Sequence, residues 1–135
     1  MIRLGKKNEL KYKELNVPFS ISPSTPFISM QIGECEADKG LKFFGYDKNN
    51  KEVTIEVRFE RMLEVKMCCM TGDSRGAPGR IGEIINSPWL KELNDNQKAE
   101  YPSFPDNFKD MHHYYFNGHD CNIEVISEGF SWKLI

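Results

Sequence analysis

The sequence predicts an α+β domain made mainly of antiparallel β-sheet, arranged as a curled sheet, a sandwich or a partial barrel, with one main helix. Apolar and polar residues alternate over much of residues 53–71, which is the period of strands with one buried face. One segment near residue 88 carries the start signals of a helix. Aromatic residues make up 12% of the chain and nine of them are Phe, a bias that suits β-rich packing.

The first part of the chain is expected to be extended. Residues 17–27 contain three prolines, which disfavour a helix. Residues 27–34 alternate as a strand does. Residues 41–59 read as a hairpin whose turn is the polar segment 47–51.

The alternation from residue 53 onward is the strongest single pattern. Nineteen residues exceed the usual strand length, and Arg61 interrupts the apolar face. We therefore expect two strands, or one sharply bent strand, with the break between Glu60 and Met62. The apolar side chains are Val53, Ile55, Val57, Phe59, Leu63, Val65, Met67 and Cys69, and the charged ones between them are Glu56, Arg58, Glu60, Glu64 and Lys66.

The one clear helix is predicted from Ser87 to Tyr101. Ser87 is a suitable N-cap and Pro88 suits the first helical position. Trp89, Leu90 and Leu93 fall on one face of this helix, and we interpret Trp89, like Trp132, as a core residue. The segment GEIIN before it reads as a short strand or an extra turn, between which periodicity does not decide.

The C-terminal part predicts a hairpin and a last strand. Asn117-Gly118 is a preferred turn pair, within a loop of two or four residues, and both registers place the same side chains on each face. Either register puts His113 opposite Asn122 or Glu124, on a face shared with Tyr115. The other face carries His112, Tyr114, Phe116, Cys121, Ile123 and Val125. Phe130, Trp132 and Leu134 then alternate in a strand on the same core.

Size and charge limit the partners. The 135 residues suffice for a single domain, 1–135. The net charge of −2 and the lack of a basic stripe disfavour nucleic acid. No segment has the apolar length of a signal peptide or a membrane span, so we expect a cytoplasmic protein without a membrane partner. The four cysteines contain no C-x-x-C pair, and we interpret them as free thiols.

A serine hydrolase is considered and rejected. The chain has two short motifs that resemble those of SGNH-type serine esterases. They are the Gly-Asp-Ser sequence around Ser74 and the Asp-x-x-His pair of Asp110 and His113. That fold needs buried parallel strands with helical crossovers, whereas the run into Ser74 alternates with charge. No Gly-Lys-Ser/Thr follows the glycines, so the segment is not a phosphate loop either. We expect no catalytic residues.

A metal site is also not expected. Five potential ligands lie between residues 112 and 121, but strand alternation sends them to opposite faces. We expect neither metal nor other cofactor. The residues in question are His112, His113, His119, Asp120 and Cys121.

The candidate binding residues are His113, Tyr115, Asn122 and Glu124, on one face of the predicted hairpin. A histidine beside a carboxylate can act as a general base or a pH-sensitive contact. The alternative interpretation is a solvated sheet face with a stabilising cross-strand pair. The sequence leaves both open.

Two segments of the chain resemble small bacterial proteins of uncharacterised function. The segment EIINSPWLKEL is similar to their NSPWI-x-EL helix start, and the segment HHYYFNGHDCNIEVISEGF is similar to their C-terminal HYxFxxxDxxxEVIA hairpin. The matching positions are Asn86, Ser87, Pro88, Trp89, Glu92, Leu93, His113, Tyr114, Phe116, Asp120, Glu124, Val125 and Ile126. Some similar proteins are thought to neutralise toxins, so the resemblance implies a non-enzymatic, immunity-type protein that binds another protein. The rival hypothesis is a small-molecule-binding protein or small enzyme using the His113/Tyr115/Glu124 face. A sheet edge would also allow a homodimer.

Overall fold

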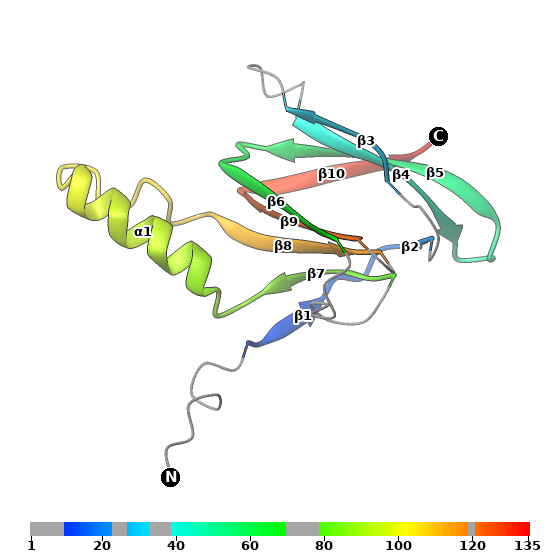
Figure 1. Cartoon of the computed structure of the whole chain (residues 1–135), viewed down its shortest axis with the longest axis horizontal. Coiled ribbons are helices and arrows are strands. Elements are labelled where there is room, and N and C mark those ends of the chain that lie inside the picture. Colours follow the sequence, from blue (N-terminus) through cyan, green and yellow to red (C-terminus); the bar gives the residue numbers. More distant parts are fainter. Residues whose placement is uncertain (1–9, 23–26, 33–38, 70–78, 119–120) are drawn as a thin grey trace, which may run out of the picture.

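The computed structural model describes residues 10–22, 27–32, 39–69, 79–118 and 121–135, with the backbone alone for 27–32, 68 and 69. These residues form antiparallel strands and a helix at one side of them (Figure 1). The elements are β1 (Tyr12–Glu14), β2 (Phe19–Ile21), β3 (Phe27–Ile32), β4 (Lys39–Asp47), β5 (Glu52–Glu60), β6 (Glu64–Cys69), β7 (Ile81–Ile84), α1 (Pro88–Glu100), β8 (His112–Asn117), β9 (Cys121–Ser127) and β10 (Gly129–Leu134).

The strands make two sheets. Sheet A has the order β1-β7-β8-β9-β6, and sheet B has the order β10-β5-β4-β2, with β3 also paired to β4. Every pairing among these strands is antiparallel. The described elements form a curled half-barrel of antiparallel strands with one helix, which confirms the predicted fold class.

A bent two-stranded ribbon joins the sheets. Strands β5 and β10 pair in sheet B and continue as β6 and β9, which pair in sheet A. At the corner Arg61 has φ of 48°. The Leu63 N–H donates to the carbonyl of Ile126 (2.8 Å) and the Glu128 N–H to that of Glu60 (2.9 Å). The predicted break between Glu60 and Met62 is therefore confirmed, and it lets one amphipathic strand cover the core from both sides.

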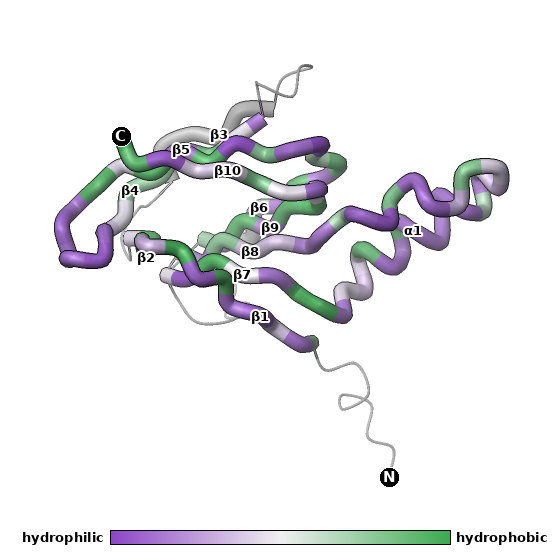
Figure 2. The backbone as a smooth tube through the Cα atoms, turned by 180° about the vertical axis from the view of Figure 1, so that it is seen from behind, coloured by the Kyte–Doolittle hydropathy of each residue, from purple (hydrophilic) through white to green (hydrophobic). Residues whose placement is uncertain are grey.

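The core lies between the inner faces of the two sheets. Phe43 and Phe116, both completely buried, lie with ring centroids 6.4 Å apart, and Phe59 packs edge-on against Phe116 at 5.6 Å. Such edge-to-face pairs add to the stabilisation from area burial. Hydrophobic residues are concentrated in the strands of the two sheets, whereas the β4–β5 turn is hydrophilic (Figure 2).

Local signals predicted the hairpin β4–β5 and the helix correctly. The Asp47 side chain accepts hydrogen bonds from the N–H groups of Asn49 and Lys51 (2.8 and 2.9 Å), the Asx-turn chemistry of such segments. The Ser87 side chain accepts the Leu90 N–H at the start of α1. The thirteen residues of α1 end at Glu100, and the described part of the chain contains no helix long and apolar enough to cross a bilayer.

The β8–β9 register differs from both predicted registers. Asn117 lies opposite Asn122, and the Gly118 N–H donates to the Cys121 carbonyl at 2.9 Å. Pairing therefore continues through the two residues predicted as the turn, and His113 lies opposite Ile126 rather than Asn122 or Glu124. Because the register changes by an even number of residues, each side chain keeps its predicted face.

Two further expectations are corrected. Cys121 is disulfide-bonded, so the interpretation of all four cysteines as free thiols is wrong. Its Cα lies opposite that of Cys69. Trp132 is 39% exposed at the sheet edge, although its ring packs on Phe19 at 5.1 Å. Strand β10 follows β9 round the corner into sheet B, where it is the last strand, so its apolar side chains are only partly covered.

Candidate functional site

The predicted binding residues lie on the outer face of sheet A, the face remote from the core. His113 and Tyr115 come from β8, and Asn122 and Glu124 come from β9. All four are at most 6% exposed. The interpretation of this face as solvated is therefore wrong, because the start of α1 and strand β1 cover it.

Ser87, His113 and Glu124 form a buried chain of hydrogen bonds. The Ser87 Oγ lies 2.6 Å from His113 Nδ1, and His113 Nε2 lies 2.6 Å from Glu124 Oε1. The carboxylate accepts the Nε2 hydrogen, and Nδ1 shares a hydrogen bond with the Ser87 hydroxyl, so both ring nitrogens have a partner. Ser87 Oγ in turn accepts the Leu90 N–H at 3.0 Å. The helix start is thereby fastened to strands β8 and β9.

Trp89 covers this hydrogen-bonded chain. Its ring stands edge-on to the His113 ring, with centroids 5.1 Å apart. Its Nε1 donates to Glu64 Oε2 (3.1 Å), and the Lys66 ammonium lies 4.2 Å from its ring centroid. The charges of Glu64 and Lys66, predicted to continue the exposed face of Glu56 and Arg58, thus surround Trp89 on sheet A instead.

A serine, a histidine and a carboxylate in series are the groups of a nucleophilic triad, but the arrangement does not suit nucleophilic attack. In that mechanism a substrate carbonyl must come within about 3.5 Å of the hydroxyl oxygen. Ser87 is 6% exposed and its oxygen already caps α1. The geometry is that of a structural network. Asp110 is exposed, whereas His113 is buried against Ser87 and Glu124; Ser74 lies outside the described residues.

Tyr115 and Asn122 do not join this network through any hydrogen bond between described residues. The Tyr115 ring packs edge-on against Tyr12, with centroids 5.9 Å apart. Tyr115 also lies over Gly82, where an added Cβ would clash with the phenol oxygen. Burial, followed by the charges of Glu14 and Tyr12, raises the pKa of Tyr115. Its role in the fold is to pack β1 onto β7 and β8.

Tyr114, on the inner face of sheet A, has a raised pKa with a measurable consequence. Burial, followed by the negative charges of Glu83 and Glu60, raises the pKa of Tyr114 to about 12. The folded state favours the neutral phenol, so folding stability falls as pH rises from about 10, where an unfolded tyrosine ionises, through about 12. Alkaline titration of phenolate absorbance on the folded protein is expected to show a component near pH 12 that Tyr114→Phe removes. Ionisation of every tyrosine near pH 10 would contradict this.

Histidine and cysteine do not assemble a metal centre in the described part of the chain, where no group of three or more His, Cys, Asp or Glu side chains could hold an ion. His112 Nδ1 instead lies 2.7 Å from Glu83 Oε2, and Cys121 is in its disulfide. His119 and Asp120 lie outside the described residues.

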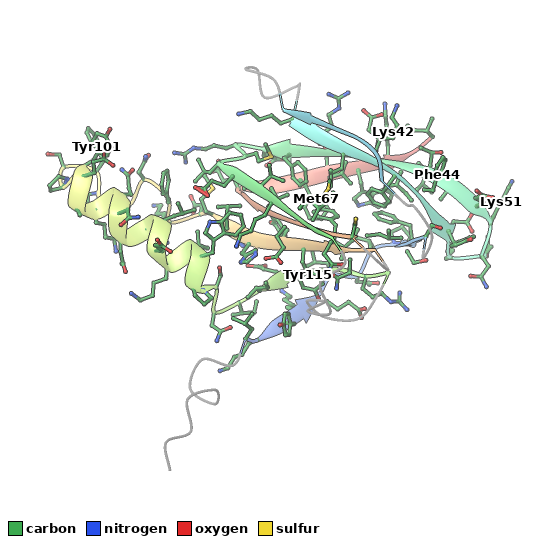
Figure 3. All side chains as sticks on the ribbon, in the orientation of Figure 1. Lys42, Phe44, Lys51, Met67, Tyr101 and Tyr115 are labelled. Atoms are coloured by element: carbon green, nitrogen blue, oxygen red, sulfur yellow. The ribbon has the colours of Figure 1, made fainter. Side chains whose placement is uncertain are left out.

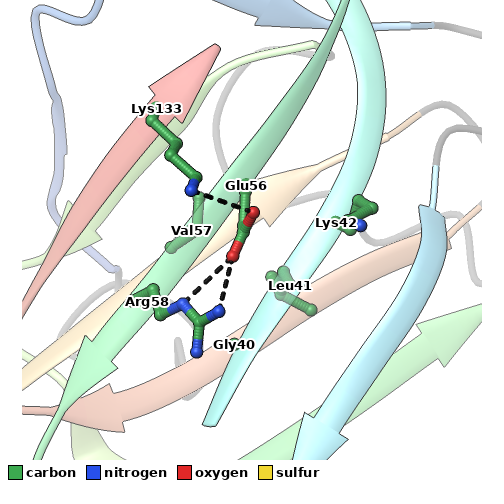
Figure 4. A pocket seen from close by; sticks show the side chains of 7 residues that line it. All are labelled: Gly40, Leu41, Lys42, Glu56, Val57, Arg58 and Lys133. Atoms are coloured by element: carbon green, nitrogen blue, oxygen red, sulfur yellow. Dashed lines mark hydrogen bonds and ion pairs between the residues drawn. The ribbon is translucent and has the colours of Figure 1, made fainter. Parts of the chain in front are cut away.

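The outer face of sheet B carries an open, charged depression. It has a volume of about 270 Å³ and is lined by Gly40, Leu41, Lys42, Glu56, Val57, Arg58 and Lys133 (Figure 4). The guanidinium of Arg58 donates to Glu56 Oε1 through Nε (3.0 Å) and Nη2 (2.7 Å). Lys133 Nζ lies 3.8 Å from Glu56 Oε2. These hydrogen bonds from Arg58, with the nearby charges of Lys133 and Lys42, lower the pKa of Glu56.

Three cations surround one carboxylate here, so the depression has a formal charge of +3 − 1 = +2 from Lys42, Arg58, Lys133 and Glu56. Gly40 deepens it, since it has no side chain beside Arg58, and an added Cβ would clash with the Val57 carbonyl oxygen. Phe44, 42% exposed, and Lys42 project from the same face of β4 (Figure 3). Sequence alternation correctly grouped Glu56 and Arg58, but the contribution of β4 and β10 required the strand order.

Comparisons with known protein families, curated proteins and solved structures found no match.

Proposed function

We propose that this chain is a non-enzymatic binding protein that recognises an acidic surface of another protein through the outer face of sheet B. The observation that carries the proposal is the cationic depression beside the exposed ring of Phe44. Exposed aromatic and arginine side chains are the types enriched at protein interfaces, and the sheet holds them on a rigid support.

Burial supports this proposal over the rival one. A small-molecule site or an enzyme would need His113, Tyr115 and Glu124 to reach a ligand. These side chains are 3%, 1% and 3% exposed, and the two hydrogen bonds of His113 already engage both of its ring nitrogens. Their chemistry is used within the fold, whereas the charges on sheet B face solvent.

The resemblance to toxin-neutralising proteins points to the same mode of action. An immunity-type protein works by occupying its partner, with charge complementarity that speeds association and rejects wrong partners. The sequence pattern led us to expect a cytoplasmic location, but the disulfide at Cys121 is typical of an oxidising compartment. Partner searches should therefore be run without reductant.

The test starts with a tagged protein used to capture a stoichiometric partner from the native source, which is then purified and titrated by calorimetry. The double substitution Lys42→Glu/Lys133→Glu reverses two charges of the depression. We expect it to weaken binding by about tenfold or more, equivalent to about 1.4 kcal/mol, mainly through slower, salt-sensitive association.

The matched control is Lys48→Glu/Lys51→Glu, which makes the same charge change at the exposed β4–β5 turn. This control should bind like the wild type. An equal loss of affinity in both double variants would mean that the effect comes from the net charge of the protein rather than from the depression. If no protein partner is captured, and a small molecule raises the melting temperature only while His113 is intact, the rival function would replace this one.

A further inference from the structure

Strand β10 ends sheet B with one edge that no described strand covers. It pairs with β5 alone. The Ile135 N–H donates to the Thr54 carbonyl (2.8 Å), so the odd residues of β10 direct their backbone groups toward β5. Since these directions alternate along an antiparallel strand, the N–H and C=O groups of Phe130, Trp132 and Leu134 point to the opposite edge. No described residue hydrogen-bonds to them there.

This edge is also apolar. Trp132 and Leu134 are 39% and 41% exposed. Natural proteins protect free edges with charges, proline or bulges, because an exposed edge pairs with other chains. Strand β1, the end strand of sheet A, has Lys13 and Glu14. Strand β10 has the single charge of Lys133 and neither proline nor an irregular register.

The sequence of β10 is complementary to itself. In an antiparallel pair of two β10 strands related by a twofold axis at Trp132, each outward-pointing residue meets another outward-pointing residue. Phe130 lies opposite Leu134 of the second copy, and the two Trp132 residues lie opposite each other. Lys133 lies opposite Ser131, so no like charges face each other across the strands, which would be destabilising. Every outward backbone group of these three residues, to which no described residue hydrogen-bonds, thus gains a partner.

We propose that two copies of this chain associate edge to edge through β10, antiparallel about a twofold axis at Trp132, to form a homodimer with a continuous sheet. The contact is isologous and closes on itself, as in most symmetric dimers. It places the apolar strip of Phe130, Trp132 and Leu134 against its own copy. It also brings the two charged depressions of sheet B to the same side of the joined sheet, which gives a bivalent surface.

Analytical ultracentrifugation of the full chain tests the dimer. We expect a mass of twice the 15.7 kDa chain. The substitution Trp132→Lys puts like charges opposite each other at the axis and should return the protein to a single-chain mass. A second variant, Leu134→Pro, removes an outward N–H without touching the β5 pairing, and proline is tolerated at such edge positions. It should have the same effect, with circular dichroism confirming that both variants are folded.

Met67→Lys is the matched control, because Met67 is 52% exposed on β6, the far edge of sheet A. This variant should remain dimeric. A dimer that survives Trp132→Lys and Leu134→Pro, or that only Met67→Lys disrupts, would place the interface elsewhere and overturn the proposal. So would a single-chain mass at about 1 mM, where even a complex with millimolar Kd is substantially formed.

Discussion

The substitution Glu124→Leu is expected to lower the free energy of unfolding by about 3–5 kcal/mol, the usual cost of removing one partner from a buried pair. The change leaves His113, 3% exposed, with no acceptor for its Nε2 hydrogen. The hydrogen bond from Ser87 to the ring, and with it the attachment of the helix start, should weaken too. Urea denaturation followed by circular dichroism measures the loss.

Two further variants separate the hydrogen bond from the charge. Glu124→Gln keeps an acceptor oxygen for His113 and should cost less than Glu124→Leu. The double variant Glu124→Leu/His113→Leu removes both buried polar groups and should recover part of the stability, because replacing a whole buried pair by apolar side chains is often neutral or better. The exposed Glu52→Leu is the control and should change stability by no more than about 0.5 kcal/mol. A double variant no more stable than Glu124→Leu alone would contradict the account.

Phe116→Ala is expected to be equally damaging, with a loss of about 3–5 kcal/mol. Phe116 is completely buried and its ring meets those of Phe43, Phe59 and Phe130, at 6.4, 5.6 and 5.6 Å between centroids. Its removal leaves a cavity between the two sheets. Since a small domain has only about 5–15 kcal/mol in total, thermal and urea unfolding should both show a large shift.

The milder Phe116→Leu keeps the experiment interpretable if the alanine variant does not fold, because it leaves a smaller cavity. The control is Phe44→Ala on the exposed face of sheet B, where the ring is 42% exposed. We expect the control to cost far less than Phe116→Ala. Equal losses at the two positions would mean that the core does not lie between the inner faces of the sheets.

Period-two alternation predicted most of the fold because it records which side chains avoid water. It identified β5 and β6 and the break between them, and the faces of β8 and β9. Local chemistry predicted the turn after Asp47 and the cap at Ser87. The same alternation could not choose the register of β8 and β9, because shifting a pair by an even number of residues leaves every facing unchanged.

The candidate site was predicted only in part. Sequence reasoning placed His113 and Glu124 on one face, and their contact is present, although diagonal to the register. It missed Ser87 as the second partner of His113, since 26 residues separate them in the sequence. The preference for serine at a helix N-cap showed where Ser87 lies, but it does not reveal a contact with a distant strand.

Local sequence patterns specify strands β3 to β6 and β8 to β10, the hairpin turn at Asp47 and the start of the helix, because each depends on side chains a few residues apart. They do not specify β1, β2 or β7, which are short and lack a period-two pattern of their own. Tertiary structure decided the rest, because it depends on which surfaces meet in space. Trp89 and Ser87 cover the second face of sheet A and bury the polar side chains of His113 and Glu124. The sequence pattern placed these side chains on one face but left open whether that face binds a partner or only meets solvent. The bend at Arg61 places the last strand at the end of sheet B, where no other described strand pairs with its outer side. The order of β4, β5 and β10 brings the exposed charges of sheet B together.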